Sequence, residues 1–380
     1  MNILELNWNL GVGGQQRHVV DLSNFLVSKG HNVFLLSQGG VLQRDLDERV
    51  VHVKIPFNKF FPKFFKKILN PFNLLLYISI RRKYLKLLSE KKIDVIHCHG
   101  VAEAYFCLKN KRSAPIICSS HGYLDDTWKW HTKIIKNADY FIGVSNFTTQ
   151  KLNKYISKKA KTETINYGIA KKDLTYYPNN IREITLKNVF KGQNINDFKV
   201  VVTVARLSYQ KGYDILLKAI PKLLKNEPKL RFIFVGSGDC EFELKQLAKN
   251  LDVENQIAFV GMQQDVYPFL LAGDVFCLPS RYEGLPLSIV EAYRSGLPVV
   301  VSNASGNPEI VKIDKTGYVF LSENVEDLTD KLLKVIEDEK KLIILKRNAQ
   351  EYGNDSFFDP EYVHTRIENF YKSILLGKHG

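Results

Sequence analysis

Two glutamates lie eight residues apart in residues 279–292, whose sequence is PSRYEGLPLSIVEA. Glu283 precedes a helix expected to begin near Leu287, and Glu291 lies two turns into it. Amide groups at such a helix start bind phosphate oxygens, and a carboxylate in the helix accepts hydrogen bonds from a diol such as ribose. Taken singly, Glu283 is also a favourable charge at the helix start and Glu291 an exposed helix residue. Together the two residues favour a site for a phosphorylated ligand.

Two cations, Arg206 and Lys211, follow an expected strand at residues 200–204. Arginine grips phosphate oxygens as a planar fork, and lysine acts as a point charge. Such a pair suits the neutralisation of a diphosphate leaving group. The simpler alternative is a pair of solvated surface cations.

Two glycine-containing loops also follow expected strands. Residues 236–239 (GSGD) allow a backbone to approach a ligand closely, although such a segment is more often only a turn. Residues 11–14 (GVGG) follow the first strand and open a helix near Gln15, where an anion can meet free backbone amides. The dinucleotide fingerprint needs a third glycine where Gln16 stands and an acidic residue where Ser37 stands, so a nicotinamide cofactor is disfavoured.

The elements that position these residues alternate between β-rich and helical patterns, which is typical of a doubly wound α/β fold with parallel sheets. Residues 170–198 lack a clean period and predict a connection between two such domains. The expected strands are 3–6, 33–37, 51–55, 94–97, 116–119 and 140–144 before this connection, and 200–204, 231–235, 256–260, 275–278 and 299–302 after it. A ligand is expected at the carboxyl ends of the strands, in the cleft between the domains.

Net charge is unevenly distributed along the 380 residues. The chain has 54 Lys and Arg against 40 Asp and Glu, a net charge of +14. Residues 1–180 hold 28 basic and 13 acidic residues, so the whole excess lies in the first half. We expect an anionic surface to meet that half. Nucleic acid is disfavoured as this partner, because no basic motif of the known nucleic-acid-binding folds is present.

The cysteines and histidines do not favour a metal site. Five cysteines without a C-x-x-C pair argue against structural zinc and against a disulfide framework, and they fit a reducing cytosol. His97 and His99 flank Cys98, but alternation along a strand sends neighbouring side chains to opposite faces. We therefore expect no metal.

A basic aromatic segment occupies residues 59–69. At 100° per residue its phenylalanines fill one side of a helix and its lysines the other, a pattern suited to an anionic membrane interface. The alternative is that the aromatic side packs on the core of the first domain. The candidate membrane or acceptor residues are Phe60, Phe61, Lys63, Phe64, Phe65, Lys66 and Lys67. The longest apolar run, 74–80, is too short to span a bilayer.

These motifs, in this order, resemble the retaining glycosyltransferases of family 4, which have a GT-B fold of two facing Rossmann-like domains. The resemblance covers nearly the whole chain and is most specific at Glu283 to Glu291. Its other markers are Gly13-Gly14 with residues 16–20, residues 97–100 (HCHG), His121-Gly122, residues 144–146 (VSN), and Arg206 with Lys211. Residues 166–170 (NYGIA) depart from the family pattern, since Tyr167 is extra and an aspartate is missing.

The resemblance implies a role for each motif. Arg206 and Lys211 would contact the donor diphosphate, Glu291 the ribose, Glu283 the transferred sugar, and His121 the sugar hydroxyls. The expected catalytic residues are Glu283, His121, Arg206 and Lys211. The expected donor-binding residues are Gly13, Gly14, Arg206, Lys211, Gly236, Gln264, Asp265, Val266, Glu283, Gly284, Leu285, Pro286, Leu287 and Glu291.

The resemblance also implies the domain functions. An acceptor-binding domain is expected over 1–175, a connection over 176–198, and a nucleotide-sugar-binding domain over 199–357. A terminal helix over 358–380 has apolar spacing that permits packing back on the first domain.

The expected reaction is metal-independent transfer of a hexose or N-acetylhexosamine with retention of configuration. The donor is a nucleotide-diphosphate sugar, by family frequency a UDP-sugar, and no separate cofactor is expected. The acceptor is a lipid-linked saccharide or glycolipid at the inner face of the cell membrane, in bacterial cell-surface polysaccharide assembly. A sugar-nucleotide epimerase of similar fold, a transferase with a soluble acceptor and a sugar-nucleotide sensor are the alternatives.

Overall fold

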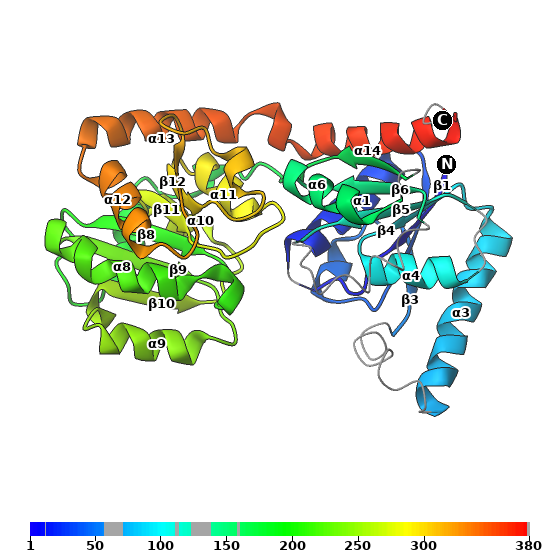
Figure 1. Ribbon diagram of the computed structural model, residues 1–380, viewed down its shortest axis with the longest axis horizontal. Coiled ribbons are helices and arrows are strands. Elements are labelled where there is room, and N and C mark those ends of the chain that lie inside the picture. Colours follow the sequence, from blue (N-terminus) through cyan, green and yellow to red (C-terminus); the bar gives the residue numbers. More distant parts are fainter. Residues whose placement is uncertain (12, 57–70, 111–113, 123–137, 158–159, 378–380) are drawn as a thin grey trace. The chain divides into compact units, whose positions relative to one another are not determined.

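The computed structural model describes residues 1–11, 13–56, 71–110, 114–122, 138–157 and 160–377. The chain divides into two compact units. Unit 1 comprises Met1–Ile169 with Asp359–Gly380, and unit 2 comprises Ala170–Phe358. Each unit is built around one parallel sheet with helices on both faces (Figure 1).

The sheet of unit 1 has seven parallel strands in the order β3-β2-β1-β4-β5-β6-β7. The apolar residues of its inner strands β1, β2, β4 and β5 are buried on both faces, as is typical of parallel strands, whereas Val51 in the edge strand β3 is exposed. The strands are β1 (Asn2–Leu6), β2 (Asn32–Ser37), β3 (Val51–Lys54), β4 (Val95–Cys98), β5 (Ile116–Ser120), β6 (Tyr140–Gly143) and β7 (Lys161–Thr164).

Alternation along the strands of unit 1 separates two cores. Ile3 and Val95 face the core that α1 (Gly14–Ser28) and α14 (Pro360–Leu375) share, and Leu4 and Ile96 face the core that α3 (Pro71–Lys91) and α4 (Val101–Lys109) share. The remaining helix of the described part of unit 1 is α6 (Asn146–Tyr155), with a 3-10 turn η1 (Val41–Asp45).

Helix α14 belongs to unit 1 although unit 2 precedes it in the chain (Figure 1). Asp359 caps its start by accepting a hydrogen bond from the Glu361 amide at 2.9 Å, and Pro360 occupies the first turn, where no amide hydrogen is needed. Val363, Ile367 and Phe370 recur at helical spacing and are buried in the core beside α1. This packing closes the core that α14 shares with α1 in unit 1.

The sheet of unit 2 has six parallel strands in the order β10-β9-β8-β11-β12-β13. They are β8 (Lys199–Val204), β9 (Leu230–Val235), β10 (Ile257–Gly261), β11 (Val275–Leu278), β12 (Val299–Ser302) and β13 (Gly317–Phe320). The helices are α7 (Ile181–Val189), α8 (Tyr213–Asn226), α9 (Glu241–Asn250), α10 (Tyr267–Leu271), α11 (Leu287–Arg294), α12 (Val325–Ile336) and α13 (Glu339–Gly353). The short 3-10 turns are η4 (Leu174–Tyr176), η5 (Tyr209–Lys211), η6 (Glu254–Gln256), η7 (Asn307–Ile310) and η8 (Ser356–Phe358).

The predicted fold class, two Rossmann-like parallel-sheet domains, is confirmed. The structure places residues 170–198, including α7, in unit 2. In both sheets the strand order reverses beside the first strand, between β1 and β4 and between β8 and β11, and ligands bind at such switch points. No helix in the described segments is both long and apolar enough to cross a bilayer.

Candidate functional site

The centre of the candidate site in unit 2 is an ion pair between Lys211 and Glu283. Lys211 Nζ lies 2.5 Å from Glu283 Oε1, which also accepts a hydrogen bond from Ser280 Oγ at 2.6 Å. Lys211 is at the end of η5, after β8, and Glu283 is in the loop after β11. The two strands flank the switch point of the sheet, so the topology brings together two loops that lie far apart in sequence.

Two glycines allow the loops at this edge to lie close together. Gly212 has φ of +66°, and a Cβ there would lie 2.0 Å from the Pro279 carbonyl oxygen. Gly236 has φ of +141°, and a Cβ there would lie 2.0 Å from the Ala205 carbonyl oxygen. Any other residue at either position would separate the strand ends.

Arg206 has a different environment from Lys211. Its side chain is exposed, and within the described chain it has no carboxylate partner, only a 3.4 Å contact from Nη2 to Gln210 Oε1. The guanidinium is therefore available to an anion. Of the two predicted cations, Lys211 is thus held by a carboxylate and Arg206 is free to bind an anion.

Helix α11 begins at Leu287, directly after Gly284, Leu285 and Pro286, which are buried. Pro286 is the residue before its first turn, and no side chain caps that turn. Uncapped first-turn amides at a helix N-terminus favour an anion. Their place directly after Glu283 puts this anion-binding feature in the same loop as the ion pair.

Glu291 and the segment after β10 form the other side of this edge. Burial, together with the charge of Asp265, raises the pKa of Glu291 to about 7, although Arg294 partly opposes the shift. Asp265 accepts hydrogen bonds from the Tyr177 hydroxyl and from the Tyr267 amide, the latter at 3.2 Å. Asp265 and Glu291 are thus close enough to interact electrostatically, whereas the neighbouring Gln264 is exposed and Val266 half-buried.

Unit 1 has its own cavity at the equivalent edge of its sheet. A hollow of about 380 Å³ lies between the loop after β1 and the start of α4. Its lining residues include Trp8, Gln15, Gln16 and Glu103. Gly13 and Gly14 are at the start of α1, next to this lining, but are not part of it. An aromatic wall with amide and carboxyl groups suits a saccharide.

Glu103 is the most unusual group in this cavity lining. Its side chain is 1 % exposed, and Oε1 accepts the Trp8 amide at 2.9 Å. Oε2 is buried and has no hydrogen-bond partner in the part of the chain that the structure describes. Burial raises the pKa of Glu103 to about 8, so the carboxyl is largely protonated at neutral pH and can donate a hydrogen bond.

His121 forms hydrogen bonds with two side chains, Tyr167 and His99, and His99 links it to Glu5. Its Nδ1 contacts the Tyr167 hydroxyl, and its Nε2 lies 3.3 Å from Nδ1 of His99. His99 Nε2 lies 3.3 Å from Oε1 of Glu5. Because the carboxylate accepts, the protons are on Nε2 of both rings and Tyr167 donates to His121.

Burial keeps His121 neutral. It lowers the pKa of His121 well below the ordinary value, and the neighbouring His99 lowers it further. Both ring nitrogens of His121 are engaged inside unit 1. A sugar hydroxyl could bind a ring nitrogen only by replacing one of these partners.

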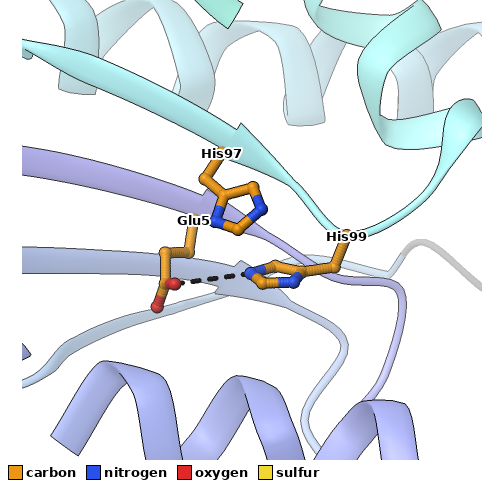
Figure 2. Close-up of side chains that lie close together, drawn as sticks. All are labelled: Glu5, His97 and His99. Atoms are coloured by element: carbon orange, nitrogen blue, oxygen red, sulfur yellow. Dashed lines mark hydrogen bonds and ion pairs between the residues drawn. The ribbon is translucent and has the colours of Figure 1, made fainter. Parts of the chain in front are cut away.

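Glu5, His97 and His99 form a group with metal-ligand chemistry, and Figure 2 shows their side chains together. Positions 97 and 99 are two apart, so the alternation that separates His97 from Cys98 puts the two histidines on the same face, and the argument from alternation was wrong. His97 Nδ1 lies 2.5 Å from the Tyr371 hydroxyl and Nε2 lies 2.6 Å from Ser119 Oγ. Every ring nitrogen of the two histidines thus has a hydrogen-bond partner without an ion.

The structure therefore brings the predicted residues into two groups, one in each unit. Arg206, Lys211, Gly236, Glu283 and Glu291 follow strands at one edge of the sheet of unit 2. His121, Gly13 and Gly14 belong to unit 1.

Sequence reasoning missed Glu103, whose only signal is its place three residues into a helix after a glycine. The basic aromatic segment from Phe60 to Lys67 lies outside the described residues.

Two family models match the chain. The model described as "Glycosyltransferase Family 4" matches residues 12–172, and the model described as "Glycosyl transferases group 1" matches residues 186–352. An uncharacterized glycosyltransferase from Haemophilus influenzae is 28% identical over 84% of this chain and 86% of its own length. The UDP-Gal:alpha-D-GlcNAc-diphosphoundecaprenol alpha-1,3-galactosyltransferase of Escherichia coli is 28% identical over 77% of this chain and 79% of its own.

Solved structures are similar in fold. HepE from Anabaena in complex with UDP-glucose has a TM-score of 0.79 and 20% identity, and the match covers 98% of this chain and 100% of that one. The fold and the two family models thus define a GT-B glycosyltransferase. The chain belongs to the group 1 glycosyltransferases, in family 4, and the resemblance seen in its sequence is confirmed.

Proposed function

We propose that this glycosyltransferase moves a hexose or N-acetylhexosamine from a UDP-sugar to a lipid-linked saccharide or glycolipid, with retention of configuration. The observation that carries the proposal is the convergence of Lys211, Glu283 and the start of α11 at one edge of the unit 2 sheet. Breaking the anomeric bond builds negative charge on the departing diphosphate. Fixed cations and helix amides lower the barrier by stabilising that charge.

The residues of unit 2 divide the donor between them in this proposal. Arg206 and Lys211 bind the diphosphate, and Gly236 leaves room for its approach. Glu291 accepts hydrogen bonds from the ribose, and Gln264 to Val266 lie beside the base. Glu283 accepts a hydrogen bond from the Lys211 ammonium in the free enzyme and faces the sugar in the complex. A phosphate oxygen of the donor takes the proton of the acceptor hydroxyl, so no resident metal or cofactor takes part.

The acceptor binds to unit 1 in this proposal. The cavity beside Trp8, Gln15 and Glu103 provides the aromatic wall and polar groups that a saccharide needs. His121 lies near the sugar hydroxyls. The names of the Escherichia coli and Anabaena proteins support a UDP-sugar, and the first also supports a diphosphoundecaprenol acceptor.

In this proposal the enzyme associates with the inner face of the cell membrane, and its exposed positive charge supports this. Arg82, Lys83 and Lys86 are exposed on α3, which directly follows the basic aromatic segment. Cations near an anionic lipid surface contribute about 1 kcal/mol each. Together these groups favour a peripheral enzyme of cell-surface polysaccharide assembly.

The deciding experiment incubates the enzyme with UDP-, GDP- and ADP-sugars, with and without lipid-linked or soluble saccharide acceptors. We expect UDP release that grows with lipid-linked acceptor, and NMR of the product should show the anomeric configuration of the donor. An inverted product would overturn the retaining mechanism. An epimerised donor without nucleotide release would show an epimerase, and faster release with free saccharide a soluble acceptor.

A further inference from the structure

Arg281 lies in the loop after β11, two residues before Glu283, and its side chain reaches the segment after β8. The side chain is 10 % exposed. Its Nη1 donates to the Tyr209 carbonyl oxygen at 2.7 Å, and its guanidinium carbon is 3.9 Å from the centre of the Tyr209 ring. Tyr209 begins the 3-10 turn η5 that ends at Lys211. Arg281 therefore contacts the segment that positions the cation of the candidate site.

Two carboxylates complete the environment of the guanidinium. Asp214 in α8 receives a two-pronged contact, with Nη1 and Nη2 each 2.8 Å from one of its oxygens. Glu323 accepts from Nε and, at 3.2 Å, from Nη2. Hydrogen bonds donated to Asp214 raise the pKa of Arg281 despite partial burial. Burial raises the pKa of Asp214, but Arg281 outweighs it and holds that pKa below the usual value.

The five N–H donors of this guanidinium are all in use. An arginine side chain has five such donors, and the contacts to Tyr209, Asp214 and Glu323 number five. No donor is left for a phosphate. Arg281 thus differs from Arg206, whose exposed side chain has no carboxylate partner among the residues described here.

Two further hydrogen bonds, one between backbone groups and one from a side chain, join the two loops beside Arg281. The Arg281 amide donates to the Gln210 carbonyl oxygen at 2.8 Å, and Gln210 Nε2 donates to the Tyr282 carbonyl oxygen at 2.9 Å. The Lys211 segment and the Glu283 loop therefore form one cross-linked structure, which includes the Lys211–Glu283 ion pair.

We propose that Arg281 is a positioning residue for the donor diphosphate. By tying η5 to the loop after β11, it fixes the Lys211 ammonium where the second phosphate of the nucleotide binds, without touching the substrate itself. The inference rests on the proposed function, in which Lys211 contacts the diphosphate. Lysine cannot replace Arg281, because a single ammonium cannot bridge Asp214, Glu323 and the Tyr209 carbonyl in this planar arrangement.

The experiment compares the dissociation constants of UDP and UMP by calorimetry, since the two nucleotides differ only in the second phosphate. Arg281→Met is expected to weaken UDP binding about tenfold, the size of one charge-assisted hydrogen bond, with UMP unchanged. Arg281→Lys should lose nearly as much affinity for UDP. Asp214→Asn, which keeps the arginine, should lose less of this affinity. The matched control is Arg347→Met, which removes an exposed arginine of α13.

Lys211→Ala separates the inference from the function on which it rests. If Lys211→Ala lowers the preference for UDP over UMP, adding Arg281→Met to it should cause no further loss, because the positioned group is gone. Three outcomes would overturn the inference alone. They are equal weakening of UDP and UMP binding by Arg281→Met, additive losses of UDP affinity in the double variant, and no effect of Arg281→Met. No effect of Lys211→Ala on the preference would instead overturn the diphosphate role of Lys211. Thermal unfolding of each variant identifies any that fail to fold.

Discussion

The ammonium of Lys211 and the carboxylate of Glu283 are 2.5 Å apart although 72 residues separate them in the chain. Both side chains are largely buried, so neither charge is stable there without the other or a ligand. In the proposed function, a nucleotide diphosphate takes the place of the carboxylate as partner of Lys211. The free enzyme is thus held ready for an anion.

Loss of either cation is expected to abolish most turnover. Arg206→Ala and Lys211→Ala should each lower kcat/KM by about 10²- to 10³-fold, the range for removing one stabilising donor of a developing charge. The measurement is acceptor-dependent UDP release. Lys245→Ala, which removes an exposed lysine of α9 paired with Glu241, is the control and should leave turnover unchanged. Turnover that survives both active-site changes would contradict the proposed leaving-group role.

The pKa of Glu291, about 7, predicts a pH dependence of donor binding. Above pH 7 the carboxylate is ionised and accepts hydrogen bonds from the ribose strongly, whereas below it the protonated carboxyl accepts more weakly. The KM for UDP-sugar should therefore rise as the pH falls through 7. Glu291→Gln should have a raised KM that no longer changes over this range. If the pH profiles of both enzymes coincide, Glu291 does not contact the ribose.

The raised pKa of Glu103 predicts how folding stability depends on pH. The folded carboxyl has a pKa of about 8 against 4.5 for the ordinary group, so between these values the folded state keeps a proton that the unfolded chain releases. This contribution is fully present below pH 4.5 and is lost as the pH rises towards 8. Glu103→Gln lacks this contribution. The melting temperature of the variant should therefore rise relative to that of the wild type as the pH increases from 4.5 to 8. A constant difference would refute the shift.

Glu103 also tests where the acceptor binds. Glu103→Ala should raise the KM for the saccharide acceptor with little change in the KM for the donor, because the cavity belongs to unit 1. Gly100→Ala should have a similar effect, since a Cβ there would lie 2.5 Å from Oε2 of Glu103. Equal effects on both substrates would show a general structural role instead.

Tyr167 is expected to set the protonation of His121. Its hydroxyl donates to the lone pair of Nδ1 and thereby stabilises the neutral ring, so Tyr167→Phe should raise the pKa of His121. NMR of ¹⁵N-histidine-labelled protein should show His121 of the wild type as the neutral Nε2–H tautomer, with a pKa well below the ordinary histidine value. The variant should titrate at higher pH. His121→Ala identifies the signal, and unchanged titration in Tyr167→Phe would disprove this arrangement.

Charge on α3 predicts salt-sensitive membrane binding. Arg82→Ser with Lys86→Ser should weaken binding to phosphatidylglycerol-containing vesicles by about 2 kcal/mol at low salt and less at high salt. Changing Phe60, Phe61, Phe64 and Phe65 to Ser should release the enzyme from the same vesicles. Lys340→Ser with Arg347→Ser, exposed cations of α13, is the control. Vesicle sedimentation that is equal for all variants would argue that the aromatic segment packs on unit 1.

The fold could largely be predicted from the sequence, because buried parallel strands are short apolar runs between turns. The strands at 275–278 and 299–302 have their predicted bounds. Strand β7 was missed because its sequence, KTET, is polar and half-buried at the edge of the sheet. Strand β13 was also missed. It lies at an edge of its sheet and directly follows a loop, with Gly317 as its first residue.

Residues of the candidate site could be predicted only where they belong to a local sequence motif. Arg206, Lys211 and Glu283 are recognisable because each follows a strand in a fixed pattern. The five contacts of Arg281 join residues up to 72 positions apart, and no local pattern reports them. The chain from Glu5 through His99 to Tyr167 likewise depends on sheet order, which sets which strand ends are neighbours.

Because α14 completes the core of unit 1 while unit 2 precedes it, the ribosome delivers the last piece of unit 1 only after all of unit 2 has emerged. Unit 2 can then fold during synthesis, whereas unit 1 waits with the groove for Val363, Ile367 and Phe370 uncovered. Truncation just before residue 359 should consequently leave unit 2 folded and able to bind nucleotide, while the first half of the same chain is prone to aggregation.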